Sequence, residues 1–400
     1  MLKKIISFPL YYILSFLKLL FKRDTIILGT SSYHRYAGNT RYLYDFLCKN
    51  TEYKVFWLTE SKKIMDHLDL NGLSYLSNKN MIKKVYYTLK CKIVIDSGTG
   101  YYDLFNLLSR DNKVVKISTM HGSGPKLSVE RSHDIDKSIK LIKKVNTFNC
   151  VSFCTEYSQR VIGVNQLFLP LSKTKIFGLP KIDLLVDSNY INHIKAKKKW
   201  TKKILNLNET DNSKIIYYAP TFRSKSSELP IFTLRDFDIN KFNDFLASNN
   251  IYFIYTYHSM SNFISPIVNL SHIKYYGITK DPLFDNMELM IESDMMVGDY
   301  STLSTEFSIL NKPQLFIIND YDDVNNTKGF AENLRDTLPG EEINCYDQFK
   351  TTISYAFSNP SCYLEKYQSK INLLQKRYVG NLKSSSRERF KSYIDTIMMQ

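Results

Sequence analysis

A chain of 400 residues is too long for one typical core and suits two domains. Its composition is globular, since 44% of the residues are hydrophobic and only 14 are Gly and 11 are Pro, which excludes a largely disordered protein. The 54 Lys and Arg residues exceed the 39 Asp and Glu residues, and the formal charge of +15 favours nucleic acid, acidic lipid or phosphorylated substrates as partners. A genome biased toward A and T codons would also enrich Lys and Tyr, so the charge alone does not select a partner.

The six cysteines are scattered, and only Cys150 and Cys154 lie close together in the chain. No second pair or His cluster completes a zinc pattern. We therefore expect buried free thiols in a reducing compartment.

Residues 1–23 combine an apolar run with flanking lysines and predict a helix at a membrane surface. Pro9 and Lys18 interrupt the run, which leaves it short for a membrane-spanning helix, and no small-residue cleavage site marks a signal peptide. Aromatic and Leu residues between Lys3 and Arg23 suit a helix in the interface of an acidic membrane. The alternative is a helix that packs on its own domain.

Short apolar strands alternate with helices from residue 24 onward, and this order predicts a parallel α/β sheet. Strands are expected at residues 24–30, 54–58, 92–96, 113–118 and 148–153, with helices at 39–47 and 64–70 and another that begins at 155–158. The carboxyl ends of such strands form the ligand-binding edge of the sheet.

His121 lies at this expected edge, in the loop His121-Gly-Ser-Gly-Pro-Lys126. A histidine on a strand-end loop with glycine neighbours, and with Lys126 five residues later, is a candidate general base near a phosphate. The alternative is a loop histidine that only hydrogen-bonds to the backbone.

The Gly-x-Pro segment within 177–185 is where we expect the first sheet to give way to the second. The Lys-rich run 193–203 predicts one solvated helix that joins the two halves. A nucleic-acid patch is the more specific alternative for that run.

The second half repeats the alternation, with strands expected at 213–218, 250–257, 271–276 and 314–318. Arg223 follows the first of these strands, where its planar guanidinium suits a diphosphate, and His258 follows the second. A surface Arg paired with a nearby carboxylate is the alternative for Arg223.

The stretch 296–310 carries the densest set of polar candidates. An apolar run ends at Gly298-Asp299, the hydroxyls of Ser301 and Thr302 follow, and apolar residues then recur at helical spacing. A strand end, a hydroxyl pair and a helix N-terminus make an anion site, because free backbone N–H groups and the helix dipole point to one place. The alternative is a capped helix that binds no ligand. Arg223, His258 and this hydroxyl pair converge on one predicted edge, which is a stronger signal than any of them alone.

Two common nucleotide motifs are absent. The sequence has neither a Walker A motif nor a Gly-x-Gly-x-x-Gly fingerprint, which argues against P-loop ATP hydrolysis and dinucleotide redox chemistry.

Six segments, taken in order, resemble motifs of the CDP-glycerol glycerophosphotransferase family, the teichoic-acid primases and polymerases with a GT-B fold. These segments are Asn39-Thr-Arg-Tyr-Leu-Tyr-Asp45, His121-Gly122 with Lys126, Gly178-Leu-Pro-Lys-Ile-Asp183, Tyr218-Ala-Pro-Thr-Phe-Arg223, Asp299-Tyr-Ser-Thr-Leu-Ser-Thr-Glu306, and Lys328-Gly-Phe330 with Pro339-Gly340. The resemblance extends from about residue 25 to about residue 385.

The sequence departs from the family pattern at several positions. Met120 replaces a Trp, Gly298 replaces a Thr, Thr302 replaces a Ser, and Glu306 replaces an Asp that is one methylene shorter. Ser259 follows His258 where the family usually has Pro. These departures concern the substrate more than the class of reaction.

The resemblance implies an α/β, GT-B-like fold with two Rossmann-like domains that face a cleft. After the membrane-associating helix expected at 1–23, we expect an acceptor-side domain at 24–190, a CDP-alditol-binding domain at 191–385, and a C-terminal helix or tail at 386–400. The enzyme would act at the cytoplasmic face of a bacterial membrane. No cofactor, obligatory metal or nucleic acid is expected.

The implied reaction is transfer of glycerol phosphate or ribitol phosphate from a CDP-alditol to a hydroxyl of a cell-envelope glycan, or of a teichoic or capsular polymer. His121 would take the proton of the acceptor hydroxyl. Arg223, His258, Ser301 and Thr302 would hold the diphosphate as CMP leaves, with Lys126 nearby. Glu306 would accept hydrogen bonds from the ribose hydroxyls, and Asp299 would orient its loop.

Two other functions remain open on the sequence. One is a GT-B glycosyltransferase that uses a CMP- or UDP-sugar. The other is a non-catalytic basic protein that binds acidic polymers.

Overall fold

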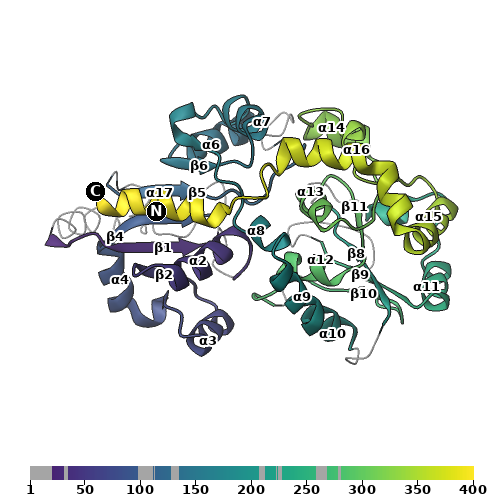
Figure 1. Ribbon diagram of the computed structural model, residues 1–400, viewed down its shortest axis with the longest axis horizontal. Coiled ribbons are helices and arrows are strands. Elements are labelled where there is room, and N and C mark those ends of the chain that lie inside the picture. Colours follow the sequence, from purple (N-terminus) through teal and green to yellow (C-terminus); the bar gives the residue numbers. More distant parts are fainter. Residues whose placement is uncertain are drawn as a thin grey trace.

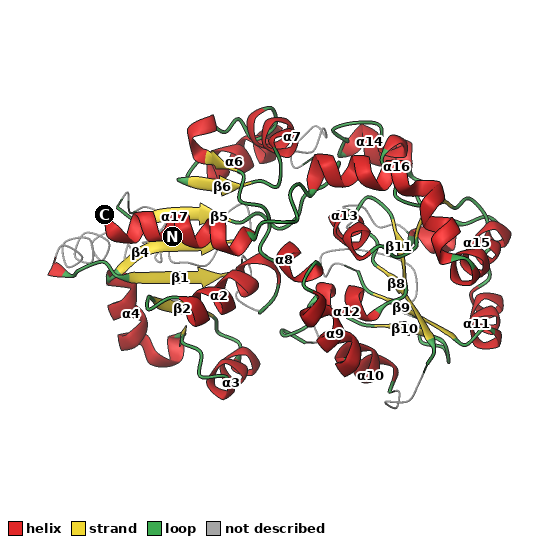
Figure 2. Cartoon of the chain, in the orientation of Figure 1, coloured by secondary structure: helices red, strands yellow, loops and turns green. Residues whose placement is uncertain are grey.

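The computed structural model describes residues 20–30, 35–97, 111, 113–127, 135–206, 212–221, 223, 228–257, 268–277 and 281–400. These residues form two parallel β-sheets, each covered by helices, as Figures 1 and 2 show. The predicted helix at 1–23 falls almost wholly outside the described residues, as does His258. No helix among the described residues is long and apolar enough to cross a membrane.

The first sheet contains seven strands, and all of its pairs are parallel. In sheet order they are β3 (Tyr75–Leu76), β2 (Lys54–Leu58), β1 (Thr25–Gly29), β4 (Cys91–Asp96), β5 (Val115–Ser118), β6 (Cys150–Ser152) and β7 (Thr174–Lys175). All five strands predicted in this half are confirmed, although β6 is shorter than expected. The two-residue edge strands β3 and β7 were not predicted.

The second sheet contains six parallel strands. In sheet order they are β10 (Ile273–Tyr275), β9 (Ile251–Tyr255), β8 (Lys214–Tyr218), β11 (Met295–Gly298), β12 (Gln314–Phe316) and β13 (Glu341–Glu342). The four strands predicted in this half and the strand that ends at Gly298 are confirmed. The carboxyl ends of β8 and β11 are followed by the segments that carry the predicted residues Arg223, Asp299, Ser301 and Thr302.

Helices cover the two sheets. They are α2 (Gly38–Asn50), α3 (Lys62–Leu70), α4 (Met81–Leu89), α6 (Ile135–Val145), α7 (Glu156–Ser158), α8 (Ile182–Leu185), α9 (Ser188–Lys197), α10 (Lys199–Leu205), α11 (Ile239–Ser248), α12 (Asn286–Glu292), α13 (Thr302–Phe307), α14 (Tyr321–Thr327), α15 (Tyr346–Ser358), α16 (Pro360–Tyr378) and α17 (Ser386–Met399). The capping box of Thr155 and Ser158 begins α7 as predicted.

Successive strand residues point to opposite faces of a sheet. In this protein helices cover both faces of each sheet, so both sets of side chains are buried. In β1, Ile26 packs in the layer that contains α2, α3 and α17, whereas Ile27 packs in the opposite layer with the end of α6. In β8, Ile215 packs with α10 and α12, and Ile216 packs with α11, α15 and α16. Continuous apolar strands therefore form the centre of two three-layer domains.

The Lys-rich run 193–203 is not one helix, and the prediction was wrong on this point. Lys198 has φ 43° and ψ 41°, the left-handed conformation, and it separates α9 from α10. The turn brings Trp200 into the core, where it is fully buried and its indole N–H donates to Glu288 at 2.7 Å. The composition of this segment indicated one solvated helix, but the segment bends at Lys198, and the bend allows Trp200 to be buried.

The chain crosses between the two domains twice. The first crossing runs through α8, where Ile182 packs in the first domain and Leu184 packs in the second. The second crossing follows α16 and leads to α17, which lies along the first sheet (Figure 1). Phe390 and Ile394 of α17 pack in the core of the first domain. The C-terminal helix is therefore part of the core of the N-terminal domain.

All six cysteines are free thiols. Cys91, Cys150 and Cys154 are buried as expected, whereas Cys362 is exposed. Burial raises the pKa of the Cys150 and Cys154 thiols to about 12, so these thiols are inert.

Candidate active site

The segment after β11 forms a capped helix start at the carboxyl edge of the second sheet. Ser301 is the N-cap of α13, and its hydroxyl accepts a hydrogen bond from the backbone N–H of Leu303 at 3.2 Å. Thr302 is the first helical residue, and both hydroxyl residues are half-buried. The structure thus places the predicted hydroxyl pair at a helix N-terminus.

Arg223 and Asp299 lie together at this edge. The guanidinium of Arg223 is 3.0 Å from Asp299 through Nη2, and its Nε donates to Asp320 at 2.8 Å. The carboxylate of Asp299 also accepts from the backbone N–H of Thr221 at 2.8 and 2.9 Å and from its hydroxyl at 2.6 Å. Asp299 therefore holds the segment that carries Arg223 at the end of β8.

Two carboxylates hold Arg223 in its charged form. Burial alone would lower the pKa of Arg223, but Asp299 and Asp320 raise it above its ordinary value. Tyr300 adds to this cluster, since its hydroxyl donates to Asp320 at 3.0 Å and its ring lies under the guanidinium. The Arg223 cluster, defined as Arg223, Asp299, Tyr300 and Asp320, joins the ends of β8, β11 and β12.

The loop that carries His121 packs directly on α13. A Cβ atom added to Gly122 would lie 2.9 Å from Cβ of Thr302 and closer still to its hydroxyl, and one added to Gly124 would lie 3.1 Å from Oγ1 of Thr305. At Gly122 any larger residue would force Thr302 to move, and at Gly124 the fit would be tight. The side chain of His121 is exposed at the start of the same loop. The first domain thus brings the predicted base to the helix N-terminus of the second domain.

Lys181 links the two halves of the site, and the sequence did not single it out. Its ammonium lies 2.6 Å from Oε1 of Glu306 and donates to the backbone carbonyl of His121 at 2.9 Å. Lys181 and Glu306 are 7% and 1% exposed, so this ion pair is buried. Burial raises the pKa of Glu306, and Lys181 opposes that shift. The signal available in the sequence was the Gly-Leu-Pro-Lys segment, but nothing in it indicated the partner.

Backbone pairing extends the same contact. Lys126 forms an antiparallel bridge with Phe330, Leu127 N–H donates to Gly329 O at 3.1 Å, and Ala331 N–H donates to Pro125 O at 2.8 Å. The predicted residue Lys126 is therefore held beside the Lys-Gly-Phe segment of the second domain. Two segments that matched family motifs separately meet here as one unit.

A second interdomain contact lies between α2 and α12. Asp285 caps α12 through Met287 N–H at 2.9 Å and also accepts from Gly38 N–H at 3.1 Å and the Tyr42 hydroxyl at 3.0 Å. Arg41 lies 3.0 Å from Glu288 and 3.5 Å from Asp285. Although burial opposes it, Arg41 and these backbone donors lower the pKa of Asp285.

No group of three or more His, Cys, Asp or Glu side chains that could hold a metal ion occurs in the part of the chain that the structure describes. Of the predicted site residues, the structure brings together His121, Lys126, Arg223, Asp299, Ser301, Thr302 and Glu306 near the boundary between the domains.

Comparison with known proteins identifies the family. The family model described as CDP-Glycerol:Poly(glycerophosphate) glycerophosphotransferase matches residues 10–394. The teichoic acid glycerol-phosphate primase of Bacillus subtilis is 27% identical over 285 residues, which cover 68% of each chain. The teichoic acid ribitol-phosphate polymerase TarK of Staphylococcus aureus is 25% identical over 172 residues, which cover 42% of this chain and 32% of TarK.

Among solved structures, the wall teichoic acid polymerase TagF, as a variant soaked with CDPG, matches with a TM-score of 0.70. That match has 18% identity and covers 94% of this chain and 90% of TagF, so it supports the fold alone. It confirms the expected GT-B-like arrangement of two parallel-sheet domains. Since the family model spans nearly the whole chain, the chain belongs to the CDP-glycerol:poly(glycerophosphate) glycerophosphotransferase family and is a transferase.

Proposed function

We propose that this enzyme transfers glycerol phosphate or ribitol phosphate from a CDP-alditol to a hydroxyl of a cell-envelope glycan, or of a teichoic or capsular polymer, and releases CMP. The observation that carries the proposal is the packing of the His121–Gly122 turn on the N-terminus of α13, across the domain boundary. A base from one domain and an anion-binding helix end from the other are what a phosphoryl transfer between two substrates requires.

His121 acts as the general base in this proposal. Its imidazole takes the proton of the acceptor hydroxyl while that oxygen bonds to the phosphorus that carries the alditol. The bond from this phosphorus to the bridging oxygen breaks, and CMP leaves with the electron pair. The exposed side chain gives a large acceptor access to the imidazole, while Lys181 fixes the backbone carbonyl of His121.

The donor diphosphate would lie against Ser301 and Thr302, with Lys126, His258 and Arg223 around it. Arg223 already faces Asp299 and Asp320, so its main contribution would be to hold the strand ends rigid, and it would share its charge with a phosphate. Glu306 would accept hydrogen bonds from the ribose hydroxyls of the donor. Among the described residues its Oε2 receives no hydrogen bond although the residue is buried, so this oxygen has an unused capacity to accept one from a hydroxyl.

Attachment to the membrane surface is part of the proposal. The described part of the N-terminal domain exposes Ile82 on α4, and Ile135 and Ile139 on α6, an amphipathic helix whose last turn carries the exposed Lys143. Apolar and basic side chains on one helix suit an acidic bilayer interface. Sedimentation with vesicles of phosphatidylglycerol, compared between the full chain and a chain without residues 1–19, measures how much of the binding the N-terminal segment provides.

A panel of donors tests the reaction. The protein is incubated with CDP-glycerol, CDP-ribitol, CMP-sugars and UDP-sugars in the presence of a lipid-linked acceptor, and nucleotide release and product length are measured, the latter by mass spectrometry. We expect CMP only from a CDP-alditol, because the family and its relatives act on alditol phosphates. Release from a sugar nucleotide alone would establish the glycosyltransferase alternative, and no release from any donor, despite binding of acidic polymer, would establish the non-catalytic one.

A further inference from the structure

Met120, the residue before the proposed base, has a strained backbone. Its φ is 53°, in the left-handed region, which is unfavourable for a residue that carries a Cβ atom. The side chain of Met120 is 4% exposed and packs in the core of the first domain, whereas the side chain of His121 is exposed. A left-handed residue of this kind persists only where its surroundings hold it. The turn at Met120 therefore needs partners that keep His121 in place.

Side chains hold both backbone groups of Met120. Its N–H donates to the hydroxyl of Ser118 at 3.2 Å. Its carbonyl accepts from Nδ2 of Asn39 at 2.7 Å, and the hydroxyl of Thr119 lies 3.2 Å from the same oxygen. Asn39 is the second residue of α2 and is 1% exposed, so little water competes for its hydrogen bond. A residue that lies 81 positions earlier in the chain thus holds the strained turn.

Asn39 also joins this turn to Lys181. Its Oδ1 accepts from the backbone N–H of Lys181 at 3.3 Å, and the ammonium of Lys181 donates to the carbonyl of His121 at 2.9 Å. Together with the bond from Asn39 to Met120, these contacts form a closed ring, which we call the Asn39 ring. A carboxamide carries a donor and an acceptor on one rigid group, so Asn39 serves both neighbours at once.

We propose that Asn39 is a positioning residue for the transfer reaction and that it acts through His121. By fixing the carbonyl of Met120 it holds the left-handed turn, and the turn sets where the imidazole meets the acceptor hydroxyl. A general base must lie within hydrogen-bond reach of the proton that it takes, so a displacement of about 1 Å is costly. The inference rests on the proposed role of His121 and extends it to a side chain of α2.

Two variants remove the hydrogen bond to Met120 in different ways. Asn39→Leu is similar in size and offers neither a donor nor an acceptor. Asn39→Asp is nearly isosteric and keeps an acceptor for Lys181, but at pH 8 its carboxylate presents an oxygen to the carbonyl of Met120. We expect kcat for CMP release, at saturating acceptor and preferred CDP-alditol, to fall at least about tenfold in each variant. The affinity for the CDP-alditol, measured by calorimetry, should change less than about twofold.

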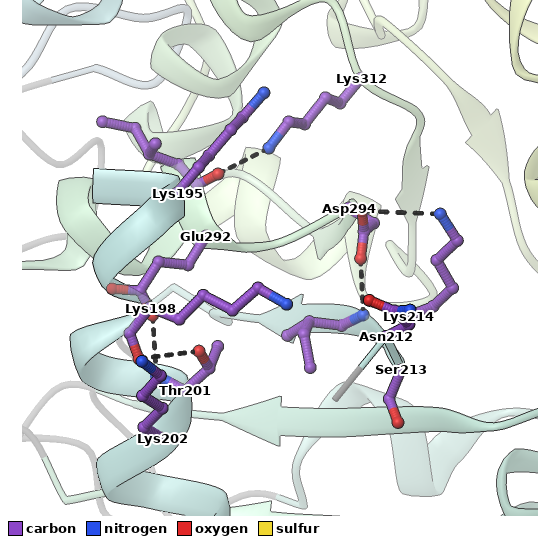
Figure 3. A pocket seen from close by; sticks show the side chains of 12 residues that line it. Lys195, Lys198, Thr201, Lys202, Asn212, Ser213, Lys214, Glu292, Asp294 and Lys312 are labelled. Carbon is purple, nitrogen blue, oxygen red and sulfur yellow. Dashed lines mark hydrogen bonds and ion pairs between the residues drawn. The ribbon is translucent and has the colours of Figure 1, made fainter. Parts of the chain in front are cut away.

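Thr201 supplies a matched control in the second domain. Lys198 is also left-handed, with φ 43°, and its carbonyl accepts from the buried hydroxyl of Thr201 at 3.1 Å. Both residues line a cavity that Lys214, at the start of β8, also borders, so they lie near the amino ends of the strands and remote from the proposed site (Figure 3). Thr201→Val removes the same kind of hydrogen bond and should leave kcat within about twofold of the wild type. Urea denaturation verifies that this variant and the two Asn39 variants are folded.

The same Asn39 variants in a His121→Ala background separate positioning from a general structural role. A residue that acts only through the imidazole has no effect once the imidazole is absent, so both variants should change the residual CMP release less than about twofold there. An equal fall in the two backgrounds, or wild-type kcat in either Asn39 variant, overturns the inference. Normal turnover of His121→Ala itself overturns the proposed base, and with it the inference.

Discussion

The ammonium of Lys181 lies 2.6 Å from Oε1 of Glu306, and this buried pair joins the two domains beside the proposed base. Lys181 comes from the segment that follows the first sheet, whereas Glu306 lies on α13 of the second. Since the same ammonium also holds the carbonyl of His121, one side chain sets the position of the His121 loop relative to the α13 helix. The contact that holds the two domains together therefore also holds the backbone of the proposed base in place.

Removal of either partner of this pair should be costly. Lys181→Met leaves a buried carboxylate unpaired, and Glu306→Gln leaves a buried ammonium unpaired, so each should lower the free energy of unfolding by about 3 kcal/mol. The double variant should lose at least ~1 kcal/mol less than the sum of the two. Urea denaturation of the four proteins measures this coupling. Lys366→Met, which breaks an exposed pair with Glu341, is the control and should cost less than ~1 kcal/mol. Strictly additive costs would show that the two side chains act separately.

The interdomain carboxylate Asp285 should make stability depend on acidic pH. Its folded-state pKa is lowered, so its contribution is fully present above the unfolded value of 3.8 and is lost as the pH falls through the folded value. The stability difference between the wild type and Asp285→Asn should therefore be constant near neutral pH and shrink below about pH 4. Urea titrations of both proteins between pH 7 and pH 3 measure it. A difference that is constant over this range would mean that the carboxylate contributes nothing through its charge.

His121→Ala should abolish most turnover without loss of donor binding. General-base catalysis contributes ~10²–10⁴-fold, so we expect CMP release to fall about 100-fold or more. The affinity for CDP-glycerol, measured by calorimetry, should change less than about twofold. His193→Ala, which removes an exposed histidine on α9, is the matched control and should retain full turnover. Loss of donor affinity in His121→Ala would place the imidazole on the donor instead of the acceptor.

Gly122→Ala should separate the His121 loop from α13. The added methyl group would overlap with Thr302, and such overpacking costs ~1–3 kcal/mol, so we expect reduced stability and at least about tenfold slower turnover. Gly29→Ala is the control in the same domain, because its new Cβ would meet Leu58 at an ordinary 3.7 Å. Thr302→Gly in the Gly122→Ala background should restore stability, since it removes the overlapping atoms. If Gly122→Ala is as stable and active as Gly29→Ala, the packing of the loop on α13 is not needed.

The strands and the polar edges of the sheets could be predicted from the sequence because buried parallel strands are continuous apolar runs. Edge strands such as Thr174–Lys175 and Glu341–Glu342 could not, since two residues carry no periodic pattern. The helix that starts after Ser301 was predictable from its cap and its apolar spacing.

Sequence patterns could not predict which residues distant in the chain would pair. Nothing local to Lys181 indicates that its ammonium is buried against Glu306, because the two residues are brought together only by the packing of the two domains. The apolar spacing of Phe390 and Ile394 predicts an amphipathic helix but does not say which domain it covers. The resemblance to the family identified which segments matter, and the structure showed which of them touch.

The two chain crossings between the domains meet at one residue. Asp183, on α8 in the first crossing, accepts hydrogen bonds from the backbone N–H of Ser386 at 2.8 Å and of Arg387 at 2.9 Å, and from the hydroxyl of Ser385 at 2.8 Å, at the end of the second. Two covalent connections fastened at one point hold the two domains together at Asp183. A protease that cuts only one of the two crossings would therefore leave a nicked molecule whose domains remain tied together.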